Sequence, residues 1–319
     1  MLRRASVLLV VPAALLAAAT PAAAKGPVLE LAGAQALAGH QVLLAGSKLA
    51  LRATAPGAQP GSTVVVTWKV NGRRARRTSQ PLAGGGEVFD SLKVELPGTV
   101  TVSANLRGPD ASDAGTAPAL SAKALLPYAT RGATGLRVRF LQSKLAALGY
   151  VVPVNGVYDV KTEFAVIAFH KVNRQARTSV ASRGVFNAVA AGRGAYRPRF
   201  PGAGRHVEFD RNRQVLALVE AGGGLRVFHS SSGRPRFRTP LGSFRFWHKE
   251  PGLNDRGMLD TVYFTHDKTS KPTRPACGIH GYFAVPTYPY SHCCLRVGLW
   301  DALYIHRWVR LGERVYIYV

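Results

Sequence analysis

The hydrophobic pattern of the chain changes its period twice, and this restricts the fold to a multidomain arrangement. Residues 48–54 alternate apolar and polar side chains, which is typical of a half-buried strand. Residues 136–148 instead repeat apolar side chains at helical spacing, and Gly149 follows them as a helix stop. Strand-like runs return after residue 205. We therefore expect a small helical unit between two β-rich regions.

The boundaries follow composition, because segments rich in Gly, Pro, Ala and Arg separate the three regions. We expect a β-sandwich, immunoglobulin-like, with Trp68 as its core aromatic residue and a role as a spacer or binding module. We expect one short helix, near 300–309, in the mainly β C-terminal domain. The expected order is a signal peptide at 1–24, the sandwich at 25–107, a linker at 108–130, the helical domain at 131–191, a linker at 192–204 and the C-terminal domain at 205–319.

The first residues predict export. Arg3 and Arg4 precede an almost wholly apolar stretch, and Ala22-Ala23-Ala24 forms a small-residue cleavage site. The alternative is a retained membrane anchor, but the apolar stretch is short of the roughly 20 residues that span a bilayer. No later segment is long and apolar enough to cross one. We expect a secreted protein of the cell wall or periplasmic space, without an integral membrane segment after cleavage.

The formal net charge of +25 predicts a polyanionic partner or surface. Charge alone fits nucleic acid, an anionic membrane and an anionic wall equally well. Because export argues against nucleic acid, we expect no nucleic-acid partner and favour the wall or a membrane surface.

The three cysteines lie close together in the sequence, at Cys277, Cys293 and Cys294. An odd number leaves at least one thiol without a partner within the chain, either for an intermolecular bond or for chemistry. His280 and His292 lie nearby, and an imidazole beside a thiol is the arrangement needed for acyl transfer. A zinc site is the alternative, but the spacings lack a paired ligand motif, so we expect no metal.

The helical region resembles the three-helix peptidoglycan-binding domain that accompanies many wall enzymes. Residues matching the domain pattern include Val138, Leu141, Gln142, Leu145, Gly149, Tyr150, Gly156, Tyr158, Asp159, Thr162, Phe169, Lys171 and Asn173. The resemblance implies the fold and a peptidoglycan partner; most of the matching residues would also serve as core, caps and turns in any such bundle.

The C-terminal region resembles the L,D-transpeptidase (YkuD-like) catalytic domain. The family signature is a histidine followed, after a gap, by Ser/Thr-His-Gly-Cys, a hydrophobic residue and Asn or Arg. Residues that match it are His280, Ser291, His292, Cys294, Leu295 and Arg296. The segments 239–244 and 285–289 are also family-like.

The resemblance implies a role for each matching residue. Cys294 is the nucleophile and His280 the general base, oriented by a backbone carbonyl because Gly281 follows it. His292 shapes the pocket, and Arg296 pairs with a substrate carboxylate or fixes the loop. The backbone N–H groups of Cys293 and Cys294 form the oxyanion hole, and Ser291 belongs to the same binding segment. No metal or organic cofactor is implied.

Cys293 departs from the family pattern, which has glycine there. Glycine is favoured where φ is positive or another backbone comes close, so a side chain at this position would strain the loop or crowd the oxyanion hole. The substitution permits a Cys277–Cys293 disulfide that leaves Cys294 free. It also permits a vicinal Cys293–Cys294 bond that would inactivate the enzyme on oxidation.

The expected function is an exported cysteine L,D-transpeptidase that forms 3→3 cross-links between peptidoglycan stem peptides, with loss of D-alanine. The implied partners are stem peptides and glycan, with carbapenem-type inhibitors acylating the thiol. Two alternatives remain open. One is an L,D-carboxypeptidase on the same scaffold, in which water replaces the acceptor amine. The other is an inactive peptidoglycan-binding protein.

Overall fold

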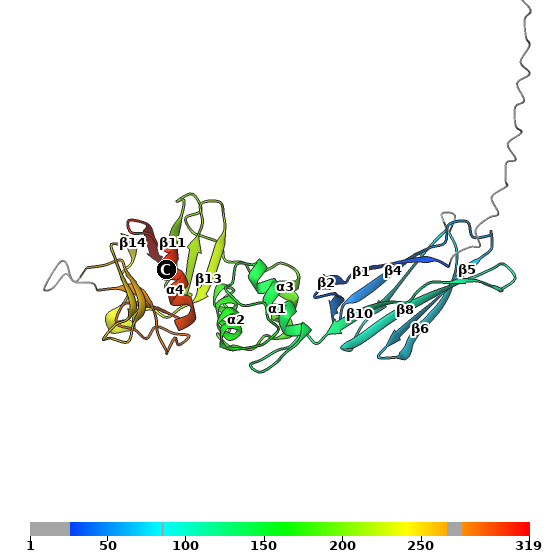
Figure 1. Ribbon diagram of the computed structural model, residues 1–319, viewed down its shortest axis with the longest axis horizontal. Helices are drawn as coiled ribbons and strands as arrows, with labels where there is room; N and C mark the ends of the chain where they lie inside the picture. The colour runs from blue at the N-terminus through cyan, green and yellow to red at the C-terminus, as the bar shows by residue number, and fades with distance from the viewer. Residues whose placement is uncertain (1–25, 84–85, 267–275) are drawn as a thin grey trace, which may run out of the picture. The chain divides into compact units, whose positions relative to one another are not determined.

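The computed structural model describes residues 26–83, 86–266 and 276–319 (Figure 1). The expected signal peptide, residues 1–24, lies outside the described residues. The chain divides into two compact units: one contains Gln41–Ala124, and the other contains Leu125–Val319. In the described ranges no helix has the length and apolar character needed to cross a membrane.

The first unit consists of two β-sheets. One sheet has the order β1-β4-β7, and the other has β2-β3-β10-β8-β5-β6 with β9 paired to β8. The strands are β1 (Val28–Ala32), β2 (Gln35–Leu37), β3 (His40–Leu44), β4 (Lys48–Thr54), β5 (Thr63–Val70), β6 (Arg73–Pro81), β7 (Glu87–Lys93), β8 (Gly98–Arg107), β9 (Asp113–Thr116) and β10 (Leu120–Leu125).

A shared apolar core joins the two sheets. It contains Leu49 and Leu51 of β4 together with Val64 and Val66 of β5, all on the inward-facing positions of alternating strands. Trp68 is fully buried within it, as expected. Its indole Nε1–H donates to Asp90 Oδ2 at 3.1 Å, so the buried polar atom is satisfied.

The sheet extends beyond residue 107, where we expected a linker to begin. β9 and β10 both pair with β8, and Ala122 and Ala124 of β10 enter the sandwich core. The linker expectation was wrong for these strands, because small alanine side chains fill inward positions without producing a strong apolar signal in the sequence.

The second unit begins with three helices, α1 (Leu136–Ala147), α2 (Val160–Val172) and α3 (Arg183–Ala190). The Asp159 carboxylate caps α2 by accepting from the Thr162 N–H at 3.0 Å. Gly149 follows α1 with φ +88°, the left-handed conformation typical of a residue that ends a helix. α2 lies against β13 of the following domain (Figure 1).

The C-terminal part of this unit has two sheets and one helix. The sheets have the orders β13-β12-β11-β19-β14 and β15-β16-β17-β18. The elements are β11 (His206–Asp210), β12 (Val215–Val219), β13 (Leu225–His229), a 3-10 turn (Pro235–Phe237), β14 (Gly242–Arg245), β15 (His248–Leu253), β16 (Leu259–Tyr263), β17 (Gly278–Gly281), β18 (Leu295–Val297), α4 (Leu299–Trp308) and β19 (Arg314–Tyr318).

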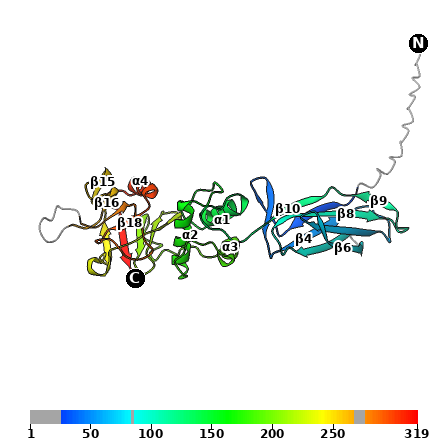
Figure 2. The same cartoon turned by 90° about the horizontal axis from the view of Figure 1, so that it is seen from below.

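One core joins both of these sheets to the helix. It includes Phe209 of β11, Val262 of β16, Leu295 of β18 and Ile305 of α4. α4 packs on β16 and β17 (Figure 2). This packing fixes β17 and β18, the strands that carry the residues of the signature.

The segment 192–204, expected as a linker, contributes to the structure of this unit. Tyr196 is buried, and its hydroxyl donates to Glu208 Oε2 at 2.8 Å. The backbone N–H groups of Arg199 and Phe200 donate to the same carboxylate at 2.9 and 2.8 Å. These bonds hold the segment along β11.

Candidate active site

The candidate nucleophile lies at the start of a buried parallel strand pair. β17 and β18 are parallel, with His280 opposite Arg296 and Ile279 opposite Leu295. Cys294 immediately precedes β18. Because side chains in register, and those two residues apart, share a face of a sheet, Cys294, Arg296 and His280 lie on the same face.

The Cys294 thiol is free and half-buried. Its Sγ accepts from the Gly278 N–H at 3.4 Å and donates to the Ala276 carbonyl at 3.6 Å. Burial raises the pKa of the thiol above its usual range, although the Gly278 N–H and the positive charge of Arg296 act in the opposite direction. The resting thiol is therefore protonated at neutral pH.

His280 is buried, and its ring orientation is fixed by its own backbone. Nδ1 lies 2.9 Å from the Gly281 carbonyl, which can only accept, so Nδ1 carries the proton and Nε2 holds the lone pair. Burial lowers the pKa of His280 to about 4, so the ring is neutral at pH 7. Gly281 is required because a Cβ there would lie 2.8 Å from the Ala302 Cβ of α4.

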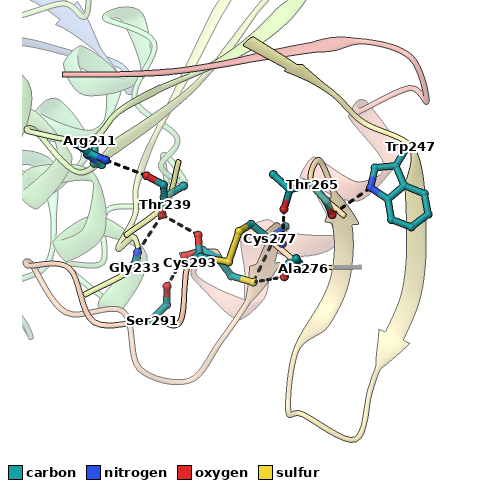
Figure 3. Close-up of a disulfide and its surroundings, with 11 residues drawn as sticks. Arg211, Gly233, Thr239, Trp247, Thr265, Ala276, Cys277, Ser291 and Cys293 are labelled. Atoms are coloured by element: carbon teal, nitrogen blue, oxygen red, sulfur yellow. Dashed lines mark hydrogen bonds between the residues drawn. A yellow bond between two sulfur atoms is a disulfide. The ribbon is translucent and has the colours of Figure 1, made fainter. Parts of the chain in front are cut away.

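The structure contains the Cys277–Cys293 disulfide, with the two Cα atoms 5.4 Å apart (Figure 3). Cys294 is free. Of the two pairings that the sequence left open, this disulfide is therefore the one that keeps the candidate nucleophile available. Cys293 has φ +102°, a conformation that favours glycine. The cysteine adopts this backbone conformation and adds a covalent bond to the segment before β17.

Thr239 holds the turn before Cys294 from the other side (Figure 3). Its hydroxyl donates to the Cys293 carbonyl at 2.7 Å and accepts from the Gly233 N–H at 3.1 Å. A Cβ at Gly233 would lie 2.8 Å from the Cys293 Cα, so only glycine allows the two backbones to come this close. Ser291 completes the turn, because its hydroxyl donates to the Cys294 carbonyl at 2.5 Å.

The backbone N–H groups of Cys293 and Cys294 are available for a ligand. Within residues 26–83, 86–266 and 276–319 neither amide has a hydrogen-bond acceptor. Two adjacent unpaired N–H groups beside a thiol have the chemistry of an oxyanion hole.

Arg296 lies between two aromatic rings on the thiol's side of the sheet. Its guanidinium carbon is 4.0 Å from the centroid of Tyr282 and 5.6 Å from that of Tyr290. One N–H group reaches the Ala284 carbonyl at 3.4 Å, while Nε is buried without a partner among the described residues. The charge is held in place, and no carboxylate among residues 26–83, 86–266 and 276–319 forms an ion pair with it.

His292 is placed differently from the other residues of the signature. It is exposed, its Nε2 accepts from Arg234 at 2.7 Å, and its ring packs 4.6 Å from that of Phe237. These contacts fix the imidazole at the rim of the site. They also hold the loop between Ser232 and Thr239 against the turn that contains Cys293.

Comparisons with known proteins identify the families of the two domains in the second unit. The profile of the L,D-transpeptidase catalytic domain (YkuD) matches residues 204–317, and that of a peptidoglycan binding domain matches residues 134–189. The crystal structure of the L,D-transpeptidase from Xylanimonas cellulosilytica is 32% identical, with a TM-score of 0.53, over 61% of this chain and 98% of that one. The chain belongs to the L,D-transpeptidase family.

Two further L,D-transpeptidase structures match more weakly. That from Stackebrandtia nassauensis is 17% identical, with a TM-score of 0.34, over 60% of this chain and 95% of that one. L,D-transpeptidase 3 from Mycobacterium tuberculosis, in complex with a faropenem-derived adduct, is 18% identical, with a TM-score of 0.30, over 36% and 60%. No curated protein sequence matches the chain.

In this L,D-transpeptidase family member, the helical domain contacts the loop that leads to Cys294. Lys171 of α2 is buried, and its Nζ has three acceptors, the Gln214 carbonyl at 3.0 Å, the Ser230 carbonyl at 2.8 Å and His229 Nδ1 at 2.7 Å. Burial lowers the pKa of Lys171 well below its usual value, but three acceptors match the three protons of an ammonium group and favour that form here. Burial lowers the pKa of His229 well below its usual value, so its neutral Nε2–H donates to the Val285 carbonyl at 2.9 Å.

Sequence reasoning did not assign roles to several of these residues. Thr239 and Lys171 appeared only as matches to family patterns, and Gly233 and His229 were not identified. A lysine within the apolar pattern of a helix is a usable signal, because a buried amine needs acceptors around it. Gly233 and His229 carried no such signal, since their partners are far away in the sequence.

Proposed function

We propose that the chain is an exported cysteine L,D-transpeptidase that uses Cys294 to form 3→3 cross-links in peptidoglycan. The observation that carries the proposal is the free Cys294 thiol on the same face of the β17–β18 pair as His280. The two family domains indicate action on peptidoglycan at the cell wall or in the periplasm.

His280 is suited to act as the general base. The Gly281 carbonyl fixes the tautomer, which leaves the Nε2 lone pair for the thiol proton. With a pKa of about 4 the ring is neutral and able to accept a proton at neutral pH. Since the thiol is also neutral at rest, its proton moves to Nε2 as Sγ attacks the substrate.

The proposed reaction has two acyl-transfer steps. Sγ of Cys294 bonds to the carbonyl carbon of the third residue of a donor stem, and the bond from that carbon to the nitrogen of the terminal D-alanine breaks. The proton held by His280 passes to the leaving amine, and a thioester remains. An acceptor amine then attacks the thioester, gives its proton to His280, and releases Cys294, which regains its proton.

Two features of the site support stabilisation of charge. The N–H groups of Cys293 and Cys294, which have no acceptor among the described residues, would bind the oxyanion of each tetrahedral intermediate. The Arg296 guanidinium, caged by Tyr282 and Tyr290, is the candidate partner for a substrate carboxylate. Ser291 holds the turn that presents both groups.

Acylation by a carbapenem tests the nucleophile. We expect the unreduced protein to gain the mass of one carbapenem, because Cys294 is already free. The Cys294→Ala variant should gain none, and a Cys277→Ser/Cys293→Gly variant, which lacks the disulfide, should still be labelled. Absence of an adduct in both reduced and unreduced protein would contradict the proposal and leave a peptidoglycan-binding protein with the family fold.

Product analysis separates transfer from hydrolysis. With a donor tetrapeptide and an acceptor stem, we expect a cross-linked dimer and one equivalent of D-alanine. A tripeptide with no dimer would instead identify an L,D-carboxypeptidase. Export is tested by sequencing the amino terminus of protein recovered from the wall fraction, which we expect to begin at Lys25.

A further inference from the structure

A cavity of about 720 Å³ within the second unit is lined mainly by cationic side chains. It lies where the end of α2, the turn between β11 and β12, the segment before β11 and the end of β19 meet. The lining arginines are Arg174, Arg177, Arg197, Arg199 and Arg213; Lys171 also lines the cavity, but its Nζ is buried and bonded within the protein. Asp210 is the acidic side chain among the lining residues. We call this site the basic cleft.

Part of the charge in the basic cleft is not neutralised within the described residues. The side chains of Arg174 and Arg197 are exposed, and neither has an ion pair or hydrogen bond within the described part of the chain. Arg199 donates to the main-chain oxygen of Val319 at 2.8 Å, and its guanidinium lies 4.9 Å from the centroid of the Tyr318 ring. Arg213 pairs with Asp210 at 3.4 Å, so the acid is already in use.

Arg177 connects the basic cleft to the loop that leads into the active site. Its guanidinium donates to the Thr287 carbonyl at 2.6 Å and to the Asn212 carbonyl at 2.7 Å. Thr287 belongs to the segment before Cys294, whereas Asn212 belongs to the turn between β11 and β12. The cleft is therefore separate from the thiol but adjoins the loop that carries it.

Several like charges around one cavity repel each other and raise the energy of the folded state. A ligand that brings several negative charges into the same volume reverses this effect. Guanidinium groups bind phosphate and carboxylate through paired hydrogen bonds. The charge density favours phosphate, because a polyol phosphate carries one full charge on each short repeat, whereas carboxylates on stem peptides are more widely spaced.

We propose that the basic cleft binds a wall polymer whose negative charges are phosphodiesters. Such binding would hold the catalytic loop beside the wall through Arg177. Binding does not depend on the chemistry of Cys294, so it can be tested separately from the proposed transpeptidation.

Binding of a synthetic ten-unit glycerol phosphate oligomer to the full mature chain tests the proposal. The cleft variant is Arg174→Glu/Arg197→Glu. The matched control is Arg307→Glu/Arg310→Glu, which reverses two exposed arginines of the same unit that do not line the cleft. Both variants change the net charge equally. We expect the cleft variant to lose at least tenfold in affinity, and the control less than threefold, with unchanged thermal unfolding of both.

Three results would overturn the proposal. The first is no binding of the oligomer, and the second is an equal loss of affinity in the two variants, which would assign the binding to dispersed surface charge. The third is equal affinity for poly-L-glutamate of matched charge, which would contradict the phosphodiester assignment. Carbapenem acylation of Cys294 in the cleft variant reports on the active site independently.

Discussion

The N-terminal sandwich and the C-terminal domain are both rich in β-strands, but they bury polar groups for different purposes. In the sandwich, buried Asp90 accepts from Trp68 and Thr78 and thereby links strands of its own sheets. In the C-terminal domain, buried Thr239 and His229 bind carbonyl groups of the loop and turn around Cys294. The difference shows that one β unit satisfies its polar groups to close a core, and the other to position a thiol.

The contrast predicts that substitutions in the two domains affect different measurable properties. A change at the thiol should remove activity and leave the fold intact, whereas a change in the sandwich core should do the reverse.

The largest expected effect is that of Cys294→Ala. We expect turnover of a soluble donor stem to fall by at least about 10³-fold, because no other group supplies the covalent intermediate. Since the side chain is small and half-buried, thermal unfolding should change little. D-alanine release and calorimetry measure the two effects. A large loss of stability would show that the thiol is a structural element, and the contrast would fail.

The next effect concerns His280. We expect His280→Asn to lower kcat/KM by about 10²- to 10⁴-fold, the usual contribution of a general base. In the wild type the pKa of about 4 means that the base is present above that pH, so kcat/KM should fall as pH decreases through about 4.

Alkylation by iodoacetamide sharpens this prediction. Because burial raises the pKa of Cys294, the alkylation rate should keep rising above neutral pH. A plateau already at pH 6 to 7 would instead show a preformed thiolate–imidazolium pair and would contradict the neutral resting state.

The third effect is confined to the sandwich. Trp68 is fully buried, so Trp68→Ala should lower the free energy of unfolding of the first unit by about 3–5 kcal/mol. Activity on a soluble stem should stay within about twofold of wild type, since the second unit contains every proposed site residue. Denaturant titration and D-alanine release check both parts. A parallel loss of activity would show that the units are not independent.

The smallest effect isolates the backbone at Cys293. Removing a disulfide that spans 16 residues lowers the free energy of unfolding by about 3 kcal/mol, because the unfolded chain regains loop entropy. Glycine at 293 relieves the positive φ, which is worth about 1 kcal/mol or more, whereas alanine does not. We therefore expect Cys277→Ser/Cys293→Gly to be about 1 kcal/mol more stable than Cys277→Ser/Cys293→Ala. Equal stabilities would show that the turn relaxes once the disulfide is gone.

Much of the fold was predictable because its signals are local. The alternation over residues 48–54 corresponds to β4, and Gly149 follows the end of α1 as expected. β6 was not identified, because its residues Arg73–Pro81 are mostly exposed and basic at the edge of a sheet and carry no apolar alternation. β10 was assigned to the expected linker, because its inward-facing alanines give only a weak apolar signal.

The sequence by itself determined the class of each region and the nearness of a thiol to two imidazoles, because both follow from residues close together in the chain. Only the tertiary structure decided which two cysteines pair, which histidine shares a sheet face with Cys294, and that Lys171 and His229 brace its loop. These are contacts between segments brought together by folding. The hydrophobic periodicity of the sequence does not predict these contacts, since each depends on how separate strands and helices pack.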